Sequence, residues 1–156
     1  MPRSIIKPIL AATLVAGTLD ILSAFVFAGM AGATPMGVLR YVASGPFGGG
    51  LPATFGWAAA GLAVHFAIMA CMVAAYMLIA PRIPALLRHP IFAGLLYGLL
   101  LWIIMYWIVK PLRWPDAPLP GGLNAIAQQL FSHCVLTGLP IALIAARSFR
   151  RRSAFG

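Results

Sequence analysis

Residues 11–29 read AATLVAGTLDILSAFVFAG, an apolar run in which a single carboxylate, Asp20, lies near the middle. Three further apolar runs of similar length follow along the chain. The hydrocarbon core of a bilayer is about 30 Å thick, and about 20 helical residues cross it. We therefore expect four transmembrane helices, which should cover approximately residues 5–29, 53–80, 91–109 and 123–146.

The composition indicates the same class of protein. Hydrophobic residues make up 62% of the 156 residues and charged residues only 8%, whereas a soluble domain carries about 25% charged residues. Four spans also leave little chain for a water-soluble domain. We predict one all-α domain over residues 1–156, a polytopic membrane protein built as a four-transmembrane-helix bundle within the lipid bilayer.

Positive charge is distributed unevenly between the two sides that these spans create. Eight of the 11 lysines and arginines precede the first span, join the second span to the third, or follow the fourth. Cytoplasmic loops carry such an excess, so we expect both termini in the cytoplasm. The tail after the fourth span should contact anionic headgroups and not nucleic acid, because no folded nucleic-acid-binding domain accompanies it. Its basic residues are Arg147, Arg150, Arg151 and Arg152.

The longest connection, residues 30–52, contains a candidate surface helix. Thr34 followed by Pro35 is a good helix start, because proline is preorganised for the first helical position. We expect a short helix over about residues 35–44 in this first outer loop. Its apolar side chains and lone Arg40 favour the membrane surface over a re-entrant position.

Small residues on the helix faces indicate where the spans pack together. On a 3.6-residue period, the first span gathers its small and polar residues on one face, which also carries Asp20. Without water, membrane helices associate through close packing of small residues and interhelical hydrogen bonds. We therefore expect four glycines at helix contacts, namely Gly17, Gly61, Gly94 and Gly98. Gly94 and Gly98 could pack within the bundle or against another subunit.

Three ionisable residues are predicted to share one level of the bundle. At a rise of 1.5 Å per residue, Asp20 lies about 20 Å along its helix from the start of the first span. By the same rise, His65 and His133 lie about 16–20 Å from the outer ends of the second and fourth spans. Gln129, His133 and Thr137 also recur at every fourth residue and form a polar stripe on the fourth span. Ionisable residues at this depth usually face the bundle interior and mark function.

Several interpretations of this polar layer remain open at the level of sequence. A buried network that only fixes helix packing is one. A proton or small-solute path is another, with Asp20 as the proton-binding group and His65 and His133 as relay or gate. The two histidines could instead be the axial ligands of a haem. A lipid or small-molecule pocket is the fourth interpretation. If the polar layer is only structural, the protein could be an accessory or assembly subunit.

The chain carries no enzyme signature. It has no nucleophile elbow, no phosphate-cradling glycine loop and no metalloprotease helix. One aspartate with two histidines is a sparse set of metal ligands, so we predict no metal site and, haem aside, no cofactor. Four spans make a narrow bundle, which is compatible with a homo-oligomer or with membership of a larger membrane complex.

Parts of spans two to four resemble a known group of proteins. The run Gly61-Leu-Ala-Val-His65, the pair Ala75-Tyr76, Pro81, and the run Gly94-Leu-Leu-Tyr-Gly98 are similar to bacterial inner-membrane proteins of the YagU-like acid-resistance family. The resemblance implies a bacterial inner-membrane protein with a link to acid stress. It supplies no catalytic residues, and this chain is shorter than the family pattern.

Overall fold

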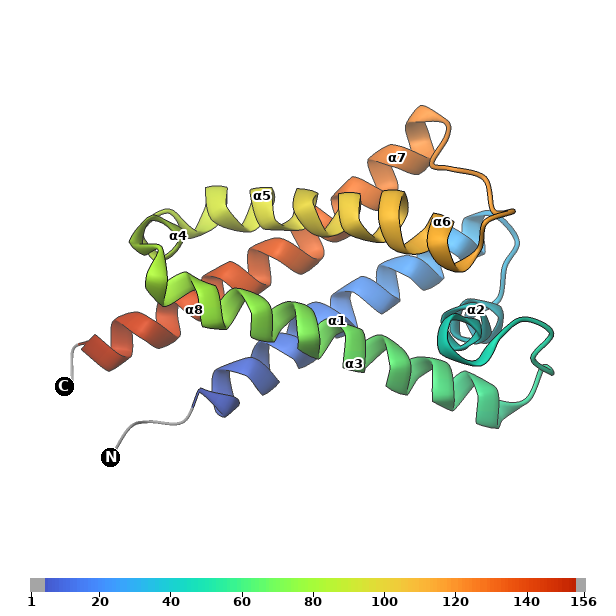
Figure 1. Ribbon diagram of the computed structural model, residues 1–156, viewed down its shortest axis with the longest axis horizontal. Helices are drawn as coiled ribbons and strands as arrows, with labels where there is room; N and C mark the ends of the chain where they lie inside the picture. The colour runs from blue at the N-terminus through green and yellow to red at the C-terminus, as the bar shows by residue number, and fades with distance from the viewer. Residues whose placement is uncertain (1–4, 154–156) are drawn as a thin grey trace.

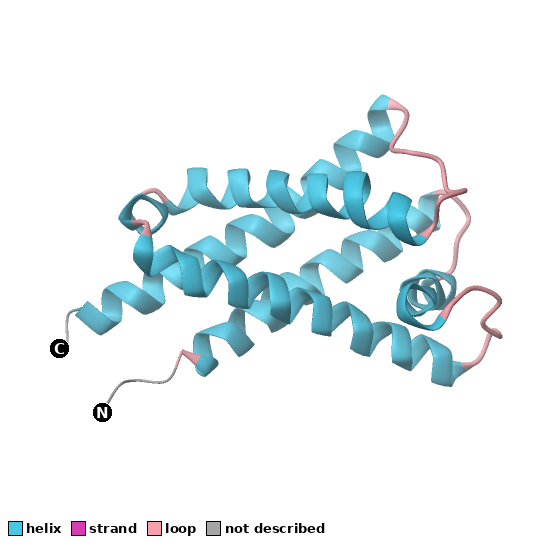
Figure 2. Ribbon diagram, in the orientation of Figure 1, coloured by secondary structure: helices cyan, strands magenta, loops and turns pink. Residues whose placement is uncertain are grey.

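The computed structural model describes residues 5–153 of the chain and their side chains through residue 150. Helices joined by loops make up this part, and it contains no strand (Figure 2). Four helical stretches are long and apolar enough to cross a membrane. They run from Ile6 to Met30, from Phe55 to Arg82, from Pro90 to Arg113 and from Leu123 to Arg150. The predicted four-helix membrane fold is therefore confirmed.

Two of these spans are nearly regular and two are composite. The first span is α1 (Ile6–Met30), and the second is α3 (Phe55–Ile79) with a 3-10 turn at Ala80–Arg82. The third joins α5 (Pro90–Ile103), the π-helical segment η2 (Ile104–Val109) and α6 (Lys110–Arg113). The fourth joins α7 (Leu123–Leu130), the π-helical segment η3 (Phe131–Gly138) and α8 (Leu139–Ser153).

Each π-helical segment comes just before a proline of its span. A proline lacks the amide hydrogen, and its ring clashes with the carbonyl four residues earlier. A π-helical turn contains more residues than an α-helical turn, which moves that carbonyl away from the proline ring. In the fourth span, η3 ends two residues before Pro140. The equivalent irregularity before Pro111 was not expected, and it continues the third span as far as Arg113.

The short helix of the first loop is α2 (Pro35–Phe47), one turn longer than predicted. Thr34 caps it by accepting a hydrogen bond from the amide of Gly37, with a donor–acceptor distance of 3.1 Å. Figure 1 shows α2 nearly end-on, whereas the spans run along the long axis of the molecule. The helix therefore lies across the bundle, as a helix at a membrane surface would.

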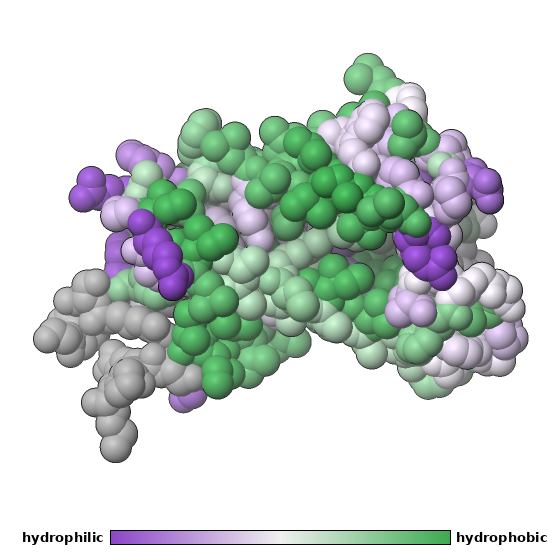
Figure 3. All heavy atoms as spheres, viewed as in Figure 1, coloured by the Kyte–Doolittle hydropathy of each residue, from purple (hydrophilic) through white to green (hydrophobic). Residues whose placement is uncertain are grey.

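The two ends of the bundle differ (Figure 1). The start of α1, the end of α8 and α4 (Pro84–Arg88) lie at one end, here termed the terminal end. At the opposite end, termed the loop end, lie α2 and the connection 114–122. Figure 3 shows apolar side chains over the middle of the molecule and hydrophilic ones gathered toward these two ends. This distribution suits a protein that crosses a bilayer.

A tightly packed core fills the terminal half of the bundle. Spans one, two and four contribute small and apolar residues to it, and eight of the ten are wholly inaccessible: Ala12, Ala16, Val73, Met77, Ala80, Ile141, Ala142 and Ala145. The other two are Met69 and Tyr76, which expose at most a few per cent of their surface. The terminal half is therefore closed.

Spans three and four touch backbone to backbone. A Cβ atom added at Gly98 would lie 2.2 Å from the carbonyl oxygen of His133 and 2.4 Å from Cα of Cys134. One added at Gly138 would lie 2.1 Å from the carbonyl oxygen of Gly94. The glycine pair of the third span thus packs inside the bundle and not against another subunit.

The other two predicted packing glycines receive different partners. At Gly17, an added Cβ would lie 2.7 Å from the ring of Phe66 on the second span. At Gly61, it would lie 1.9 Å from the carbonyl oxygen of Leu39. Because Gly61 has no side chain, α2 packs directly against α3 at this residue.

Replacing Gly98 by alanine should destabilise the bundle. The added methyl group meets backbone atoms that have no room to move, and overpacking of this kind costs about 1–3 kcal/mol. Gly29→Ala is the matched control, because nothing lies within 4 Å of a Cβ at that helical position. We expect thermal unfolding in detergent, followed by circular dichroism, to occur at a lower temperature for Gly98→Ala only. Equal transition temperatures for the two variants would contradict the packing described here.

Candidate functional site

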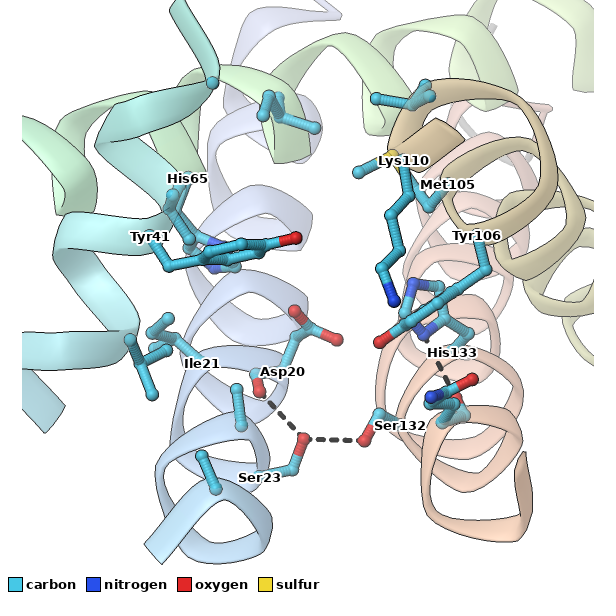
Figure 4. A pocket seen from close by; sticks show the side chains of 18 of the residues that line it. Asp20, Ile21, Ser23, Tyr41, His65, Met105, Tyr106, Lys110, Ser132 and His133 are labelled. Carbon is cyan, nitrogen blue, oxygen red and sulfur yellow. Dashed lines mark hydrogen bonds between the residues drawn. The ribbon is translucent and has the colours of Figure 1, made fainter. Parts of the chain in front are cut away.

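A cavity of about 830 Å³ occupies the loop half of the bundle. Segments α1, α2 and α3 form one side of it, and η2, α6 and η3 form the other (Figure 4). Its volume falls in the usual range of small-molecule sites, about 300–1,000 Å³. All five residues of the predicted polar layer line it: Asp20, His65, Gln129, His133 and Thr137.

Asp20 projects from α1 toward the cavity (Figure 4). The hydroxyl of Thr137 donates a hydrogen bond to its Oδ1 atom over 3.2 Å, and Thr137 itself is only 1% exposed. This contact joins the first span to the fourth. Within the described residues, the second carboxylate oxygen has no hydrogen-bond partner, so it is free to interact with whatever enters the cavity.

A serine pair makes a second link between the same two spans. The hydroxyls of Ser23 and Ser132 lie 2.8 Å apart and are buried. Each is also within hydrogen-bonding distance of a carbonyl in its own helix, that of Asp20 for Ser23 and that of Gln128 for Ser132. Ser23 shares the polar face of the first span with Asp20, but sequence patterns gave no sign of its partner Ser132.

The two histidines each contact a backbone carbonyl. Nε2 of His65 lies 2.9 Å from the carbonyl oxygen of Gly17, and Nδ1 of His133 lies 3.0 Å from that of Gln129. A carbonyl oxygen can only accept a hydrogen bond. The proton therefore resides on Nε2 of His65 and on Nδ1 of His133, which leaves the opposite ring nitrogen of each as an acceptor when the ring is neutral.

The predicted polar stripe of the fourth span does not act as one unit. Thr137 contacts Asp20, whereas the side-chain oxygen of Gln129 accepts a hydrogen bond from Nε1 of Trp102 over 3.0 Å. His133 uses the backbone of Gln129 and not its side chain. The π-helical segment explains the split, since extra residues per turn rotate these side chains away from a common line.

Lys110 lies in the cavity wall. Its Nζ atom donates to the carbonyl oxygen of Pro118 over 2.7 Å and lies 5.9 Å from the centre of the Tyr106 ring. The Tyr106 ring in turn meets His133 edge to face at a centroid distance of 5.6 Å. Connection 114–122 folds back over the end of the span, so the amino group binds a backbone carbonyl of the protein in an exposed position.

Arg113 and Trp114 hold α2 against the third span. The guanidinium of Arg113 donates to the carbonyls of Ser44 and Gly45, at the C-terminal end of α2. The Ser44 carbonyl also accepts from the Gly48 amide, and both carbonyls lie at the negative end of the helix dipole. Trp114 donates to the Ser44 hydroxyl and stacks on Tyr41 with ring centroids 4.6 Å apart.

The Tyr41 ring forms part of the cavity wall on α2. Burial raises the pKa of its hydroxyl above the usual 10.0. The group is therefore neutral at physiological pH and can donate a hydrogen bond into the cavity.

The described residues contain no group of three or more His, Cys, Asp or Glu side chains that could hold a metal ion. Haem ligation through Nε2 of His65 would require its contact with Gly17 to break. The haem alternative stays a prediction, and the absorption spectrum of the purified protein tests it.

The basic tail begins at the terminal end. Arg147 and Arg150 are exposed on α8, and Nε of Arg150 donates to the carbonyl oxygen of Ala146. Arg151 and Arg152 continue the helix, and their side chains lie outside the described part of the chain. Contact of this tail with lipid headgroups stays a prediction.

Fold and site together define a multi-pass membrane protein with an open cavity in one half of its bundle. Comparison with protein-family models, with curated proteins and with solved structures finds no match. The resemblance to the YagU-like family therefore stays a prediction.

The histidine tautomers can be tested directly. A free neutral histidine side chain favours the form with the proton on Nε2, whereas the contact with Gln129 places it on Nδ1 in His133. Nitrogen-15 NMR of histidine-labelled protein at alkaline pH should show one ring with a protonated Nδ1, and His133→Asn should remove that signal. His65→Asn is the matched control and should leave it in place. Protonation of Nε2 in all three histidines of the chain would refute the assignment.

Proposed function

We propose that the protein is a small, non-enzymatic membrane protein that binds a small solute in its cavity and aids its movement, with proton exchange at Asp20 linked to binding. One observation carries this proposal: the polar layer faces an 830 Å³ cavity instead of being sealed in the core. A purely structural network has no need of such a space.

Access to the site should be one-sided. The terminal half is closed by a core of which Ala16, Val73 and Ile141 are fully buried members. The cavity lies beyond this core, toward α2 and connection 114–122. A solute or proton would therefore enter from the loop end, and passage to the other side would require the terminal core to open.

The distribution of basic residues gives the proposed orientation of the protein in the membrane. The excess of basic residues favours a cytoplasmic terminal end, so the cavity would face away from the cytoplasm. If the resemblance to acid-resistance proteins holds, the membrane is a bacterial inner membrane and the proton-binding Asp20 would meet external acid.

A second candidate is an accessory subunit whose polar layer is structural. The Thr137–Asp20 contact and the serine pair favour it, because both join the first span to the fourth. Membrane hydrogen bonds average about 0.6 kcal/mol, so such links specify packing more than they stabilise it. The two candidates differ in whether Asp20 exchanges protons with water.

Cysteine labelling tests one-sided access. In a background with Cys71→Ala and Cys134→Ala, Ala24→Cys places a thiol in the cavity wall, and Ala16→Cys places one in the closed core of the same helix. A charged thiosulfonate that does not cross membranes should modify Ala24→Cys from the loop side and leave Ala16→Cys unmodified. Equal protection of both thiols would remove the basis for solute binding.

Infrared spectroscopy tests proton exchange at Asp20. The chain has only two carboxylic side chains, Asp20 and Asp116, so a protonated carboxyl band can be assigned by two variants. Lowering the pH should produce a C=O stretching band that Asp20→Asn removes and that the matched control Asp116→Asn retains. If Asp20→Asn leaves the pH-dependent bands unchanged, the accessory-subunit candidate is preferred.

A further inference from the structure

Opposite charges face each other across the cavity. Asp20 projects from α1 on one side, and Lys110 reaches in from the third span on the other, beside Tyr106 and His133 (Figure 4). No salt bridge joins the carboxylate to the amino group within the described residues. Each charge is therefore held on its own wall of one space.

The polar groups around this space retain unused hydrogen-bonding capacity. One carboxylate oxygen of Asp20 is free, and Lys110 uses one of its three N–H groups, on the carbonyl of Pro118. The hydroxyls of Tyr41 and Tyr106 point into the cavity and have no hydrogen-bond partner in the described part of the chain (Figure 4). A negative acceptor thus faces a positive donor and two phenolic hydroxyls.

The charge balance of the cavity limits what it can hold. The carboxylate of Asp20 and the ammonium of Lys110 cancel in net charge. Arg113 also lines the cavity; its guanidinium donates to the C-terminal carbonyls of α2, where the negative end of the helix dipole offsets part of its charge. A ligand with a single sign of charge would pair with Asp20 or with Lys110 and leave the other group without a partner, which is costly where water is scarce. A ligand with no net charge but with both signs avoids that cost.

We propose that the cavity binds a net-neutral ligand that carries an ammonium group for Asp20 and an anionic oxygen group for Lys110 and the two tyrosine hydroxyls. This inference rests on the proposed solute-binding function and names the chemical class of the solute. The ammonium group would form a charge-assisted hydrogen bond with the free carboxylate oxygen, and the anionic group would accept from Lys110.

The rest of the cavity favours a ligand that also has an apolar part. Methionines and aliphatic residues make up much of its wall, including Ile68, Met69, Met72 and Met105. In Figure 3 a strongly hydrophilic patch lies between α6 and α2 on an otherwise apolar flank. The same ammonium and anionic groups occur in zwitterionic lipid headgroups and in water-soluble zwitterions, and the experiment separates these sources.

Binding can be measured by titration calorimetry of the full chain in detergent. Lysophosphatidylethanolamine carries both groups, and lysophosphatidylglycerol with the same acyl chain lacks the ammonium group. We expect the wild type to bind lysophosphatidylethanolamine about tenfold more tightly than lysophosphatidylglycerol, because only the first lipid has an ammonium group for Asp20. Asp20→Asn should abolish this preference, while its amide oxygen can still accept from Thr137 and preserve the fold.

Lys110→Gln should weaken binding of both lipids by about tenfold, because it removes the partner of their shared phosphate group. Lys7→Gln is the matched control, since it removes the same charge from an exposed position at the terminal end. Equal affinity of the wild type for the two lipids, or a preference that survives in Asp20→Asn, would overturn the assignment.

Glycerophosphoethanolamine keeps the phosphodiester and the ammonium group, has no net charge and lacks the acyl chain, so it separates the two sources. Affinity equal to that of the lysolipid would assign the site to a water-soluble zwitterion, and loss of binding without the tail would assign it to a lipid. Cysteine labelling keeps the two proposals apart. If Ala24→Cys is labelled but the protein does not distinguish the two lysolipids, only the proposed ligand class is refuted. If Ala24→Cys is protected from labelling, the proposed binding function is refuted as well.

Discussion

The close approach of spans three and four determines the shape of the whole bundle. Gly94 and Gly98 meet Gly138 and its neighbours with no side chain between the backbones. In a bilayer, such contacts stand in for the hydrophobic effect that joins helices in water. Because the third span is drawn onto the fourth at this point, it diverges from the second span toward the loop end (Figure 1). The space left there is the cavity, which α2 and connection 114–122 partly cover.

Much of this architecture follows from the sequence alone, for physical reasons. Apolar length predicts the spans, and the cost of a charge in hydrocarbon predicts that Asp20 faces inward. The positions of Lys110 and Arg113 were not predictable in this way. A basic side chain near a helix end can extend to headgroups or turn back onto protein carbonyls. Connection 114–122 and the end of α2 decide the outcome, and their positions depend on tertiary contacts such as Trp114 on Tyr41.

The π-helical segments mark the second limit of sequence reasoning. A helical wheel assumes one angular step throughout, and on that basis Gln129, His133 and Thr137 form a line. The prolines at 111 and 140 widen the preceding turns, so the side chains of η2 and η3 follow a different rotation. These two segments contribute Tyr106 and His133 to the same cavity wall. The irregular turns therefore supply the wall that faces Asp20.

The polar layer can hold the helices together and still bind a ligand, because its hydrogen bonds are divided between the two roles. Thr137 and the serine pair satisfy the groups that lie between α1 and the fourth span. The histidine contacts use one ring nitrogen each, and Thr137 uses one oxygen of Asp20. The other ring nitrogen of each histidine and the other oxygen of Asp20 have no hydrogen-bond partner in the described part of the chain. A network built only for packing would pair this remaining capacity, since unpaired polar groups away from water are costly. Here the groups lie beside a cavity, which is the arrangement that a bound polar molecule would complete.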